Sequence, residues 1–181
     1  LVMCGIAGFV NLRGDPVGQA DASLTAMGAL LAHRGPDDSG QWVAPGARAG
    51  LAHRRLSIID LSPTGAQPMK APNDTTIVLN GEIYNYLELR DSLAPHWSFS
   101  SQSDTETILA AYERYGDECF SHLRGMFAFA LWDEKERRLV CGRDCFGIKP
   151  FYYALVGDVF YFASEAKALL PFLPDVETDP D

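Results

Sequence analysis

A cysteine lies close to the start of the chain, which begins Leu1-Val2-Met3-Cys4. When a cysteine is the first residue of a protein, its α-amino group has a pKa of about 7.7–8.0 and can accept the thiol proton near neutral pH. One residue then supplies both a nucleophile and a base. Such a site also needs donors for a developing oxyanion and groups that hold the substrate. Most isolated cysteines are unreactive, so a chemical role for Cys4 depends on which other residues accompany it.

The other cysteines are Cys119, Cys141 and Cys145. Four cysteines in 181 residues are too few for a disulfide scaffold. Three residues separate Cys141 from Cys145, whereas the usual zinc and redox motifs have two, and no histidine follows at ligand distance. We therefore expect no metal site, and we interpret Cys119 and Cys141 as buried thiols that act as small apolar side chains.

The composition is that of a globular chain. Hydrophobic residues make up 47% and charged residues 22%, which predicts one packed domain with a short tail. The net charge of −9 argues against nucleic acid or an anionic membrane surface as the main partner. No apolar run approaches the roughly 20 residues that cross a bilayer, and the first residues lack a secretory signal. We expect a soluble, cytoplasmic protein.

Hydrophobic periodicity and turn residues predict the elements that must position any site. Strands are expected at 5–12, 41–43, 49–54, 76–80, 126–132, 138–142, 151–156 and 159–163, and helices at 20–32, 104–115 and 165–170. Ser103 and Glu106 have the spacing of a capping box, and Gly81 is expected to end its strand. Strand 126–132 is apolar on both faces, so it should be covered on both sides. The mixed order predicts an α+β fold of packed sheets with helices outside.

A series of short motifs runs through nearly the whole chain. They are MCGIAGF at 3–9, HRGPD at 33–37, RLSIID at 55–60, GAQP at 65–68, NGEIYN at 80–85, SDTE at 103–106, GMFAFA at 125–130, GRD at 142–144, GIKP at 147–150 and SEAKAL at 164–169. In this order they resemble class II glutamine amidotransferases. The chain is most similar to the glutaminase domain of glutamine-hydrolysing asparagine synthetases and their relatives.

This resemblance implies an N-terminal-nucleophile hydrolase fold, with four αββα layers and two antiparallel sheets. It also implies hydrolysis of L-glutamine to glutamate and ammonia, with the ammonia passed to an acceptor domain. Residues 4–170 would form the glutaminase domain, and residues 171–181 would begin a linker to a synthetase domain of the same full-length chain. That domain would use ATP and magnesium, and its Ser-Gly-Gly type loop does not occur in these 181 residues. No cofactor is expected in the glutaminase domain itself.

The resemblance further implies the catalytic roles. The Cys4 thiolate would attack the side-chain amide carbon of glutamine and form a thioester, with its α-amine as the proton carrier. The Asn80 side chain and the Gly81 N–H match the pair of donors that stabilises the oxyanion. From the residues alone, Asn80-Gly81 would instead be read as a turn signal.

By the same resemblance, other residues would hold the substrate. Arg55 matches the clamp for the α-carboxylate, and Asp104 matches the partner of the α-ammonium, with Glu82 close by. Main-chain groups of Leu56, Ile58 and Ile59 would line the same pocket. Without the resemblance, Asp104 would be explained by the helix dipole and Arg55 as a surface residue.

Several charged residues in or near these motifs receive no catalytic role. His33 and His53 are interpreted as structural, because an α-amine makes a further base unnecessary. Asp144 and Lys149 lie within matching motifs but are assigned no role in the reaction.

The chain departs from the family pattern at its start. Leu1, Val2 and Met3 precede the nucleophile, so the Cys4 nitrogen is an amide and cannot act as a base. Residues 1–3 are expected to be additions or unprocessed residues, and the chain is expected to have little glutaminase activity until they are removed.

Three alternatives stay open. A relative of the same family could amidate another acceptor, such as a sugar or a peptide. A non-catalytic module could keep the fold for binding, although the presence of all the matched site residues argues against it. A redox or metal protein that uses the cysteines is the third. The sequence also leaves a homodimer open.

Overall fold

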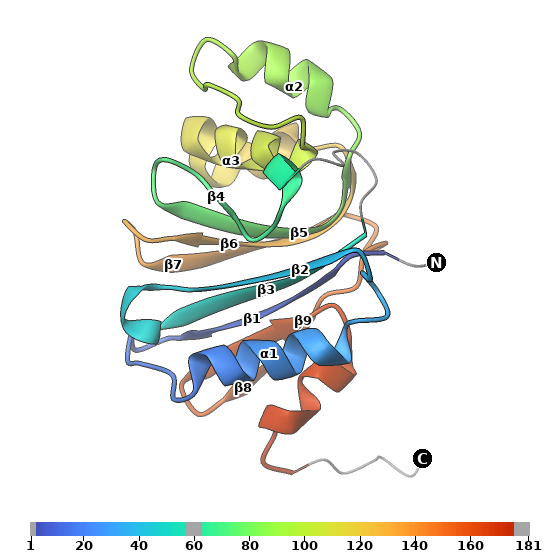
Figure 1. Ribbon diagram of the computed structural model, residues 1–181. Helices are drawn as coiled ribbons and strands as arrows, with labels where there is room; N and C mark the ends of the chain where they lie inside the picture. The colour runs from blue at the N-terminus through green and yellow to red at the C-terminus, as the bar shows by residue number, and fades with distance from the viewer. Residues whose placement is uncertain (1–2, 57–62, 176–181) are drawn as a thin grey trace.

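Two antiparallel sheets pack face to face between helices in the computed structural model, which describes residues 3–56 and 63–175 (Figure 1). The first sheet has the order β2 (Asp38–Val43), β3 (Ala49–Arg55), β1 (Gly5–Asn11), β9 (Val159–Ala163), β8 (Tyr152–Val156). The second has the order β4 (Met69–Lys70), β5 (Thr75–Ile83), β6 (Gly125–Asp133), β7 (Arg138–Arg143). The α+β fold with four αββα layers is thereby confirmed.

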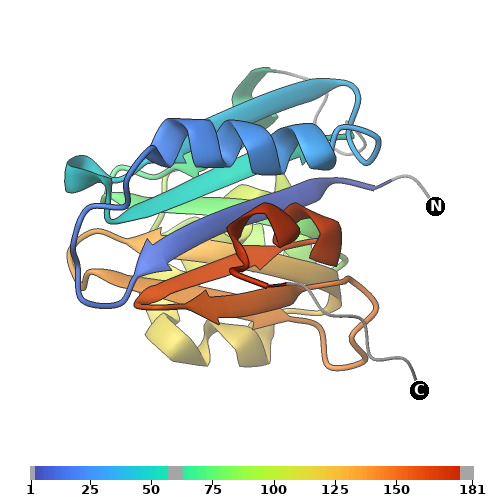
Figure 2. The same cartoon turned by 90° about the horizontal axis from the view of Figure 1, so that it is seen from below.

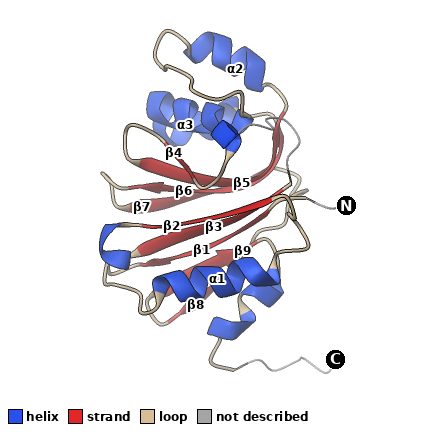
Figure 3. Cartoon of the chain, viewed as in Figure 1, coloured by secondary structure: helices blue, strands red, loops and turns tan. Residues whose placement is uncertain are grey.

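Helices cover the two outer faces. Helix α1 (Ala20–Leu30) and the short 3-10 turns Ala166–Ala168 and Leu170–Phe172 lie on the first sheet, as Figure 2 shows from below. Helices α2 (Tyr86–Leu93) and α3 (Asp104–Tyr115) lie on the second sheet (Figure 3). The remaining 3-10 turns are Pro45–Ala47, Pro63–Gly65 and Gly116–His122.

Strand β6 shows how the layers are held together. Its alternate side chains Phe127, Phe129 and Leu131 join the core beneath α2 and α3. The side chains between them, Ala128, Ala130 and Trp132, join the core between the two sheets. The prediction of a strand covered on both faces is confirmed, and burial of both faces is what excludes water from the centre of the sandwich.

Some predicted boundaries are wrong for identifiable reasons. Strand β5 does not end at Gly81 but continues to Ile83, because the glycine adopts φ 149° and fits against β6 without breaking the pairing. A Cβ at Gly81 would lie 2.1 Å from the Met126 carbonyl oxygen. The predicted helix at 165–170 is only a pair of 3-10 turns. Helix α2 and the short strand β4 were not predicted at all.

The prediction of a capping box at the start of α3 is correct for Ser103 and wrong for Glu106. The Ser103 hydroxyl accepts a hydrogen bond from the Thr105 N–H at 3.2 Å, as a cap should. Glu106 does not reach back to the Ser103 N–H. Its carboxylate instead accepts hydrogen bonds from the backbone N–H groups of Ser100 and Ser101, at 2.8 and 2.7 Å. Burial alone would raise the pKa of Glu106, but the hydrogen bond from the Ser101 hydroxyl, these two backbone bonds and one from Trp97 outweigh it and lower the pKa.

The cysteines outside the site differ in exposure. Cys119 is buried, as expected, but Cys141 is exposed, so the interpretation of Cys141 as buried is wrong. Strand β7 is an edge strand, and Cys141 there lines an open cavity. Within residues 3–56 and 63–175, no three His, Cys, Asp or Glu side chains are grouped to hold a metal ion. No helix in the described part of the chain is long and apolar enough to span a membrane.

Candidate active site

Residues far apart in sequence meet where one end of the first sheet faces β5 of the second. Gly5 pairs with Arg54 across β1 and β3, so Cys4 lies beside the end of β3. The Asp104 carboxylate, at the start of α3, accepts a hydrogen bond from the Ile83 N–H at 2.9 Å and fixes that helix to the end of β5. The described residues lining the resulting cavity are Met3, Cys4, Arg55, Leu56, Gly65, Gln67, Leu79, Gly81, Glu82, Ser103, Asp104 and Thr105.

The Cys4 thiol faces this cavity and contacts the main chain of Leu56. The Leu56 N–H donates to Sγ at 3.3 Å, and Sγ lies 3.5 Å from the Leu56 carbonyl oxygen. Burial raises the pKa of the thiol, while the N–H groups of Leu56 and of Cys4 itself and the Arg55 charge oppose that rise. Because the thiol stays protonated at neutral pH, it needs a base to become a nucleophile. The Cys4 nitrogen, whose N–H is one of the groups that lower the thiol pKa, would be an α-amine in a chain that begins at Cys4.

Arg34 and Glu165 hold Cys4 in position from the outside of the first sheet. Arg34 Nε donates to the Cys4 carbonyl oxygen at 3.0 Å, and its Nη1 donates to Glu165 at 2.9 Å. Burial alone would raise the pKa of Glu165, but hydrogen bonds from Arg34, Lys167 and His33 lower it to about 2. Arg34 and Glu165 lie in two of the matched motifs, but nothing in their spacing predicts that they meet at Cys4.

Asn80 carries an unusual buried amide. Its side chain is fully buried, and neither amide atom has a hydrogen-bond partner in the part of the chain that the structure describes. Such an unsatisfied group costs about 1–3 kcal/mol. Asn80 does not line the cavity, but its neighbours on β5, Leu79 and Gly81, do. Since successive side chains of a strand point to opposite faces, the Asn80 amide points toward the first sheet, which carries Cys4.

The Asp104 carboxyl is buried and has a raised pKa. It is 5% exposed, and burial raises its pKa to about 6, with the nearby Glu82 contributing in the same direction. The N–H groups of Ile83 and Thr105 only partly offset the burial. A cation placed against Asp104 and Glu82 would therefore be bound strongly.

Arg55 completes the opposite side of the cavity. It is the last residue of β3, is 9% exposed, and lies close enough to Cys4 to stabilise the thiolate. Arg55 and the Asp104–Glu82 pair thus place positive and negative groups around one space. Ile58 and Ile59, which were expected to contribute main-chain groups, lie outside the described residues.

Gln67 is a lining residue that the sequence did not single out. Its amide oxygen accepts from the Leu79 N–H at 2.6 Å, and its amide nitrogen donates to the Thr105 hydroxyl at 3.1 Å. It therefore connects β5 to the start of α3 behind the cavity. The cavity volume is about 50 Å³, little more than one or two water molecules fill. Met3 is among the lining residues, so loss of residues 1–3 would enlarge the space.

The residues assigned no catalytic role have structural partners. His53 is buried, and burial lowers its pKa to about 4, so it is neutral and contacts the Leu79 carbonyl oxygen at 3.2 Å. His33 pairs with Glu165 at 2.9 Å. The Asp144 carboxylate accepts hydrogen bonds from the N–H groups of Phe127, Phe146, Ile148 and Lys149 and holds the loop after β7.

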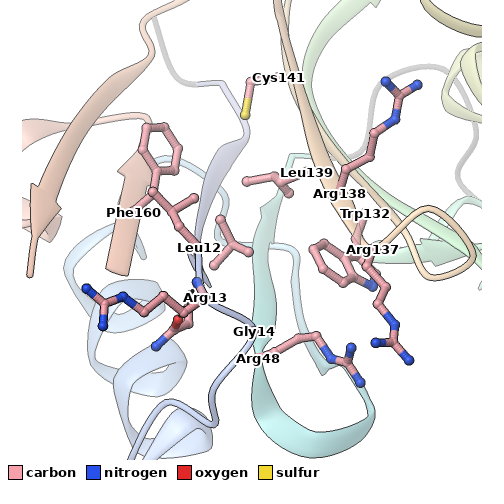
Figure 4. A pocket seen from close by; sticks show the side chains of 12 residues that line it. Leu12, Arg13, Gly14, Arg48, Trp132, Arg137, Arg138, Leu139, Cys141 and Phe160 are labelled. Atoms are coloured by element: carbon pink, nitrogen blue, oxygen red, sulfur yellow. Dashed lines mark hydrogen bonds between the residues drawn. The ribbon is translucent and has the colours of Figure 1, made fainter. Parts of the chain in front are cut away.

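A larger cavity of about 680 Å³ lies at the other end of the sandwich (Figure 4). Arg13, Arg48 and Arg137 surround an apolar floor that includes Trp132 and Phe160. It is reached at the far end of β1, about 23 Å along the strand from Cys4. It does not contain the combination of thiol, guanidinium and carboxylates found around Cys4.

Comparison with solved structures shows which known proteins share this fold. The chain is similar in structure to a glutamine phosphoribosylpyrophosphate amidotransferase from B. subtilis complexed with ADP and GMP, with a TM-score of 0.76 and 20% identity over 92% of this chain and 43% of that one. A structure described as the allosteric regulatory enzyme of purine biosynthesis gives a TM-score of 0.74 at 19% identity. The sandwich is that of the N-terminal-nucleophile amidotransferases.

Sequence comparison identifies the family. A family model described as a glutamine amidotransferase domain matches residues 3–181. Asparagine synthetase [glutamine-hydrolyzing] 1 of Bacillus subtilis is 43% identical over 98% of this chain and 28% of its own length. Amidase chry2 of Gibberella zeae is 42% identical over 94% of this chain and 27% of its own length. The chain belongs to the glutamine amidotransferase domain family and is similar to the glutaminase part of asparagine-synthetase-like proteins. It spans under a third of the length of these relatives.

The raised pKa of Asp104 predicts a gain in stability when its charge is removed. Its pKa is higher in the folded chain than in the unfolded chain, so the free energy of unfolding should fall as pH rises from about 4 to 6. Asp104→Asn should abolish this fall and stabilise the chain at pH 8 by about 2–3 kcal/mol. Urea unfolding at pH 4 and pH 8 measures the difference.

Glu106→Gln is the matched control for this prediction, because Glu106 lies on the same turn of α3 but has a lowered pKa. Its ionised form is stabilising, so Glu106→Gln should destabilise the chain at pH 8. Two variants that shift stability in the same direction would contradict the account of the Asp104 carboxyl.

Proposed function

We propose that the chain hydrolyses the side-chain amide of L-glutamine to glutamate and ammonia through a thioester on Cys4. The observation that carries the proposal is the position of the Cys4 sulfur, which lies in one cavity with Arg55 and with the Asp104–Glu82 pair. The guanidinium fits an α-carboxylate and the two carboxyls fit an α-ammonium. Free glutamine presents both groups, whereas a glutamine within a peptide presents neither.

In the proposed reaction, the α-amine of Cys4 accepts the thiol proton, and the thiolate attacks the amide carbon of glutamine. The oxyanion that forms accepts hydrogen bonds from the Asn80 side chain and the Gly81 N–H. The carbon–nitrogen bond then breaks, the α-amine delivers its proton to the leaving nitrogen, and ammonia departs. Water attacks the thioester, the amine takes the water proton and returns it to the sulfur, and glutamate leaves.

The unsatisfied amide of Asn80 supports its role as an oxyanion donor. Its N–H groups have no partner among the described residues, so no existing bond to those residues has to break when an oxyanion forms beside them. The glycine at position 81 permits a φ of 149° and a close contact with β6 that no other residue allows. Together these features fix the donors before the substrate arrives.

The fate of the ammonia depends on a part of the protein outside this chain. We propose a further domain of the same full-length chain, which activates a carboxyl group with ATP and magnesium and accepts the ammonia. Asparagine synthetases and an amidase share the glutaminase-like part at similar identity, so this part alone does not determine the acceptor. An aspartate, a sugar or a peptide is distinguished by assaying ATP-dependent amide formation with the full-length protein.

Removal of residues 1–3 should create the activity. With Met3 attached, the Cys4 nitrogen is an amide and Met3 occupies part of the cavity. General-base catalysis typically contributes about 10²–10⁴-fold to a rate. A chain whose first residue is Cys4 should therefore release glutamate from glutamine at least ~100-fold faster than the 181-residue chain. Glutamate is measured with a coupled dehydrogenase assay. Equal rates for the two chains would refute the α-amine as the base.

Asn80→Ala should lower kcat more than it changes KM. Loss of one oxyanion donor costs about 2.7–4 kcal/mol of transition-state stabilisation, or 10²–10³ in kcat. Thr76→Val is a matched control, since Thr76 is also fully buried on β5 and its hydroxyl likewise lacks a partner in the described residues. The control should keep wild-type kcat. A kcat for Asn80→Ala within threefold of the control would exclude this role.

A further inference from the structure

Lys149 is a buried lysine beside the nucleophile. It is 1% exposed and lies in the loop after β7, where its backbone N–H donates to Asp144 at 3.0 Å. In the described part of the chain, the hydrogen-bond partner of its ammonium group is the thioether sulfur of Met3. A thioether is a weak acceptor, and a buried ammonium ion normally has a carboxylate or several oxygens around it. Among the described residues, the Lys149 ammonium therefore has no oxygen within hydrogen-bond distance, and its attraction to Glu82 and Asp144 acts over a longer range.

The position of the ammonium relative to Cys4 follows from that contact. The carbonyl carbon of Met3 is bonded to the Cys4 nitrogen, so the side chain that Lys149 contacts belongs to the group that blocks this nitrogen. Burial lowers the pKa of Lys149, while Glu82, Asp144 and the Cys4 thiolate oppose that change. Lys149 thus interacts electrostatically with Cys4 from the side on which the Met3 side chain lies.

We propose that Lys149 is a positioning residue for glutamine hydrolysis: its ammonium ion faces the α-amino group that the loss of residues 1–3 creates and keeps that amine in its unprotonated form. The inference rests on the proposed function, because it concerns the base of that reaction. Two cations in a site shielded from water repel each other, so the amine binds a proton less readily. Only an unprotonated amine can accept the thiol proton.

The other cations around the amine act in the same direction. Arg34 donates to the Cys4 carbonyl oxygen at 3.0 Å, and Arg55 lies near the Cys4 sulfur. Both are also engaged elsewhere, Arg34 with Glu165 and Arg55 in the proposed grip on the substrate. Lys149, by contrast, has no carboxylate partner within hydrogen-bond distance among the described residues.

The nearby anions oppose the effect in part. Glu82 and Asp104 face the site from β5 and from the start of α3, and Asp104 has a pKa of about 6. Both are expected to pair with the α-ammonium of bound glutamine. The Asp144 carboxylate already accepts hydrogen bonds from four backbone N–H groups, including that of Lys149. Whatever these anions contribute, removing the Lys149 charge changes the field at the amine in one direction, toward a higher amine pKa.

The test compares Lys149→Met, Lys149→Arg and the parent in chains whose first residue is Cys4. Methionine has a similar length and no charge, and it removes a buried ion, so the fold should be kept, as thermal unfolding can verify. In Lys149→Met, the acidic limb of the pH profile of kcat/KM should move up by about one pH unit, a tenfold loss of rate below it. Lys149→Arg should keep the parent profile. Lys135→Met, at the exposed β6–β7 turn, removes the same charge far from the site and should change nothing.

A direct titration separates the amine from the thiol. In a Cys4→Ser background the terminal amine is the group that titrates, and its pKa is read by nitrogen-15 NMR with and without Lys149→Met. The inference predicts that Lys149→Met raises the amine pKa by about one unit. An unchanged amine pKa would overturn it, even if Lys149→Met lowered activity. A raised amine pKa in a chain that releases no glutamate would instead contradict the proposed function and leave the contact between the two cations established.

Discussion

The contact between the two sheets is the constraint on which the site depends. Cys4 and Arg55 belong to the first sheet, where the pairing of Gly5 with Arg54 sets them side by side. Asn80 and Gly81 belong to the second sheet, and small side chains such as Ala128 and Ala130 let it pack closely on the first. No single element contains the proposed nucleophile, the proposed oxyanion donor and the proposed substrate clamp. The three come together only because the two sheets pack face to face. Burial of the apolar inner faces stabilises this packing, and the same burial therefore holds the site together.

Three buried polar groups around this site are each expected to destabilise the folded chain. Burial raises the pKa of Asp104, the Asn80 amide has no hydrogen-bond partner among the described residues, and the Lys149 ammonium contacts a thioether. Each feature would be unfavourable in an ordinary core. In the proposed reaction, glutamine and a free α-amine would compensate for each feature, because they would supply a cation for Asp104, an oxyanion for Asn80 and a nearby basic group for Lys149. The pattern is that expected of a preorganised site.

Much of the fold could be predicted from the sequence, because periodicity and turn residues act locally. The hairpin around Gly157, the doubly covered strand β6 and the cap at Ser103 are of this kind. The continuation of β5 through Gly81 was not predictable in this way, since it depends on space left by β6. The resemblance assigned roles to Cys4, Arg55, Gly81, Glu82 and Asp104, which line the cavity, but none to Arg34, Gln67 or Lys149. Their contacts join segments 30 to 146 residues apart, and no spacing rule reports such distances.

The central claim is that the sulfur of Cys4 is acylated by the side-chain amide of glutamine. Diazo-oxo-norleucine, an electrophile shaped like glutamine, tests it on a chain whose first residue is Cys4. Peptide mapping by mass spectrometry should find one adduct per chain, on Cys4, and excess glutamine should suppress it. Cys141 and Cys145 are exposed and provide internal controls for non-specific reaction. Labelling spread over those two cysteines, with Cys4 unmodified or unprotected by glutamine, would contradict the account.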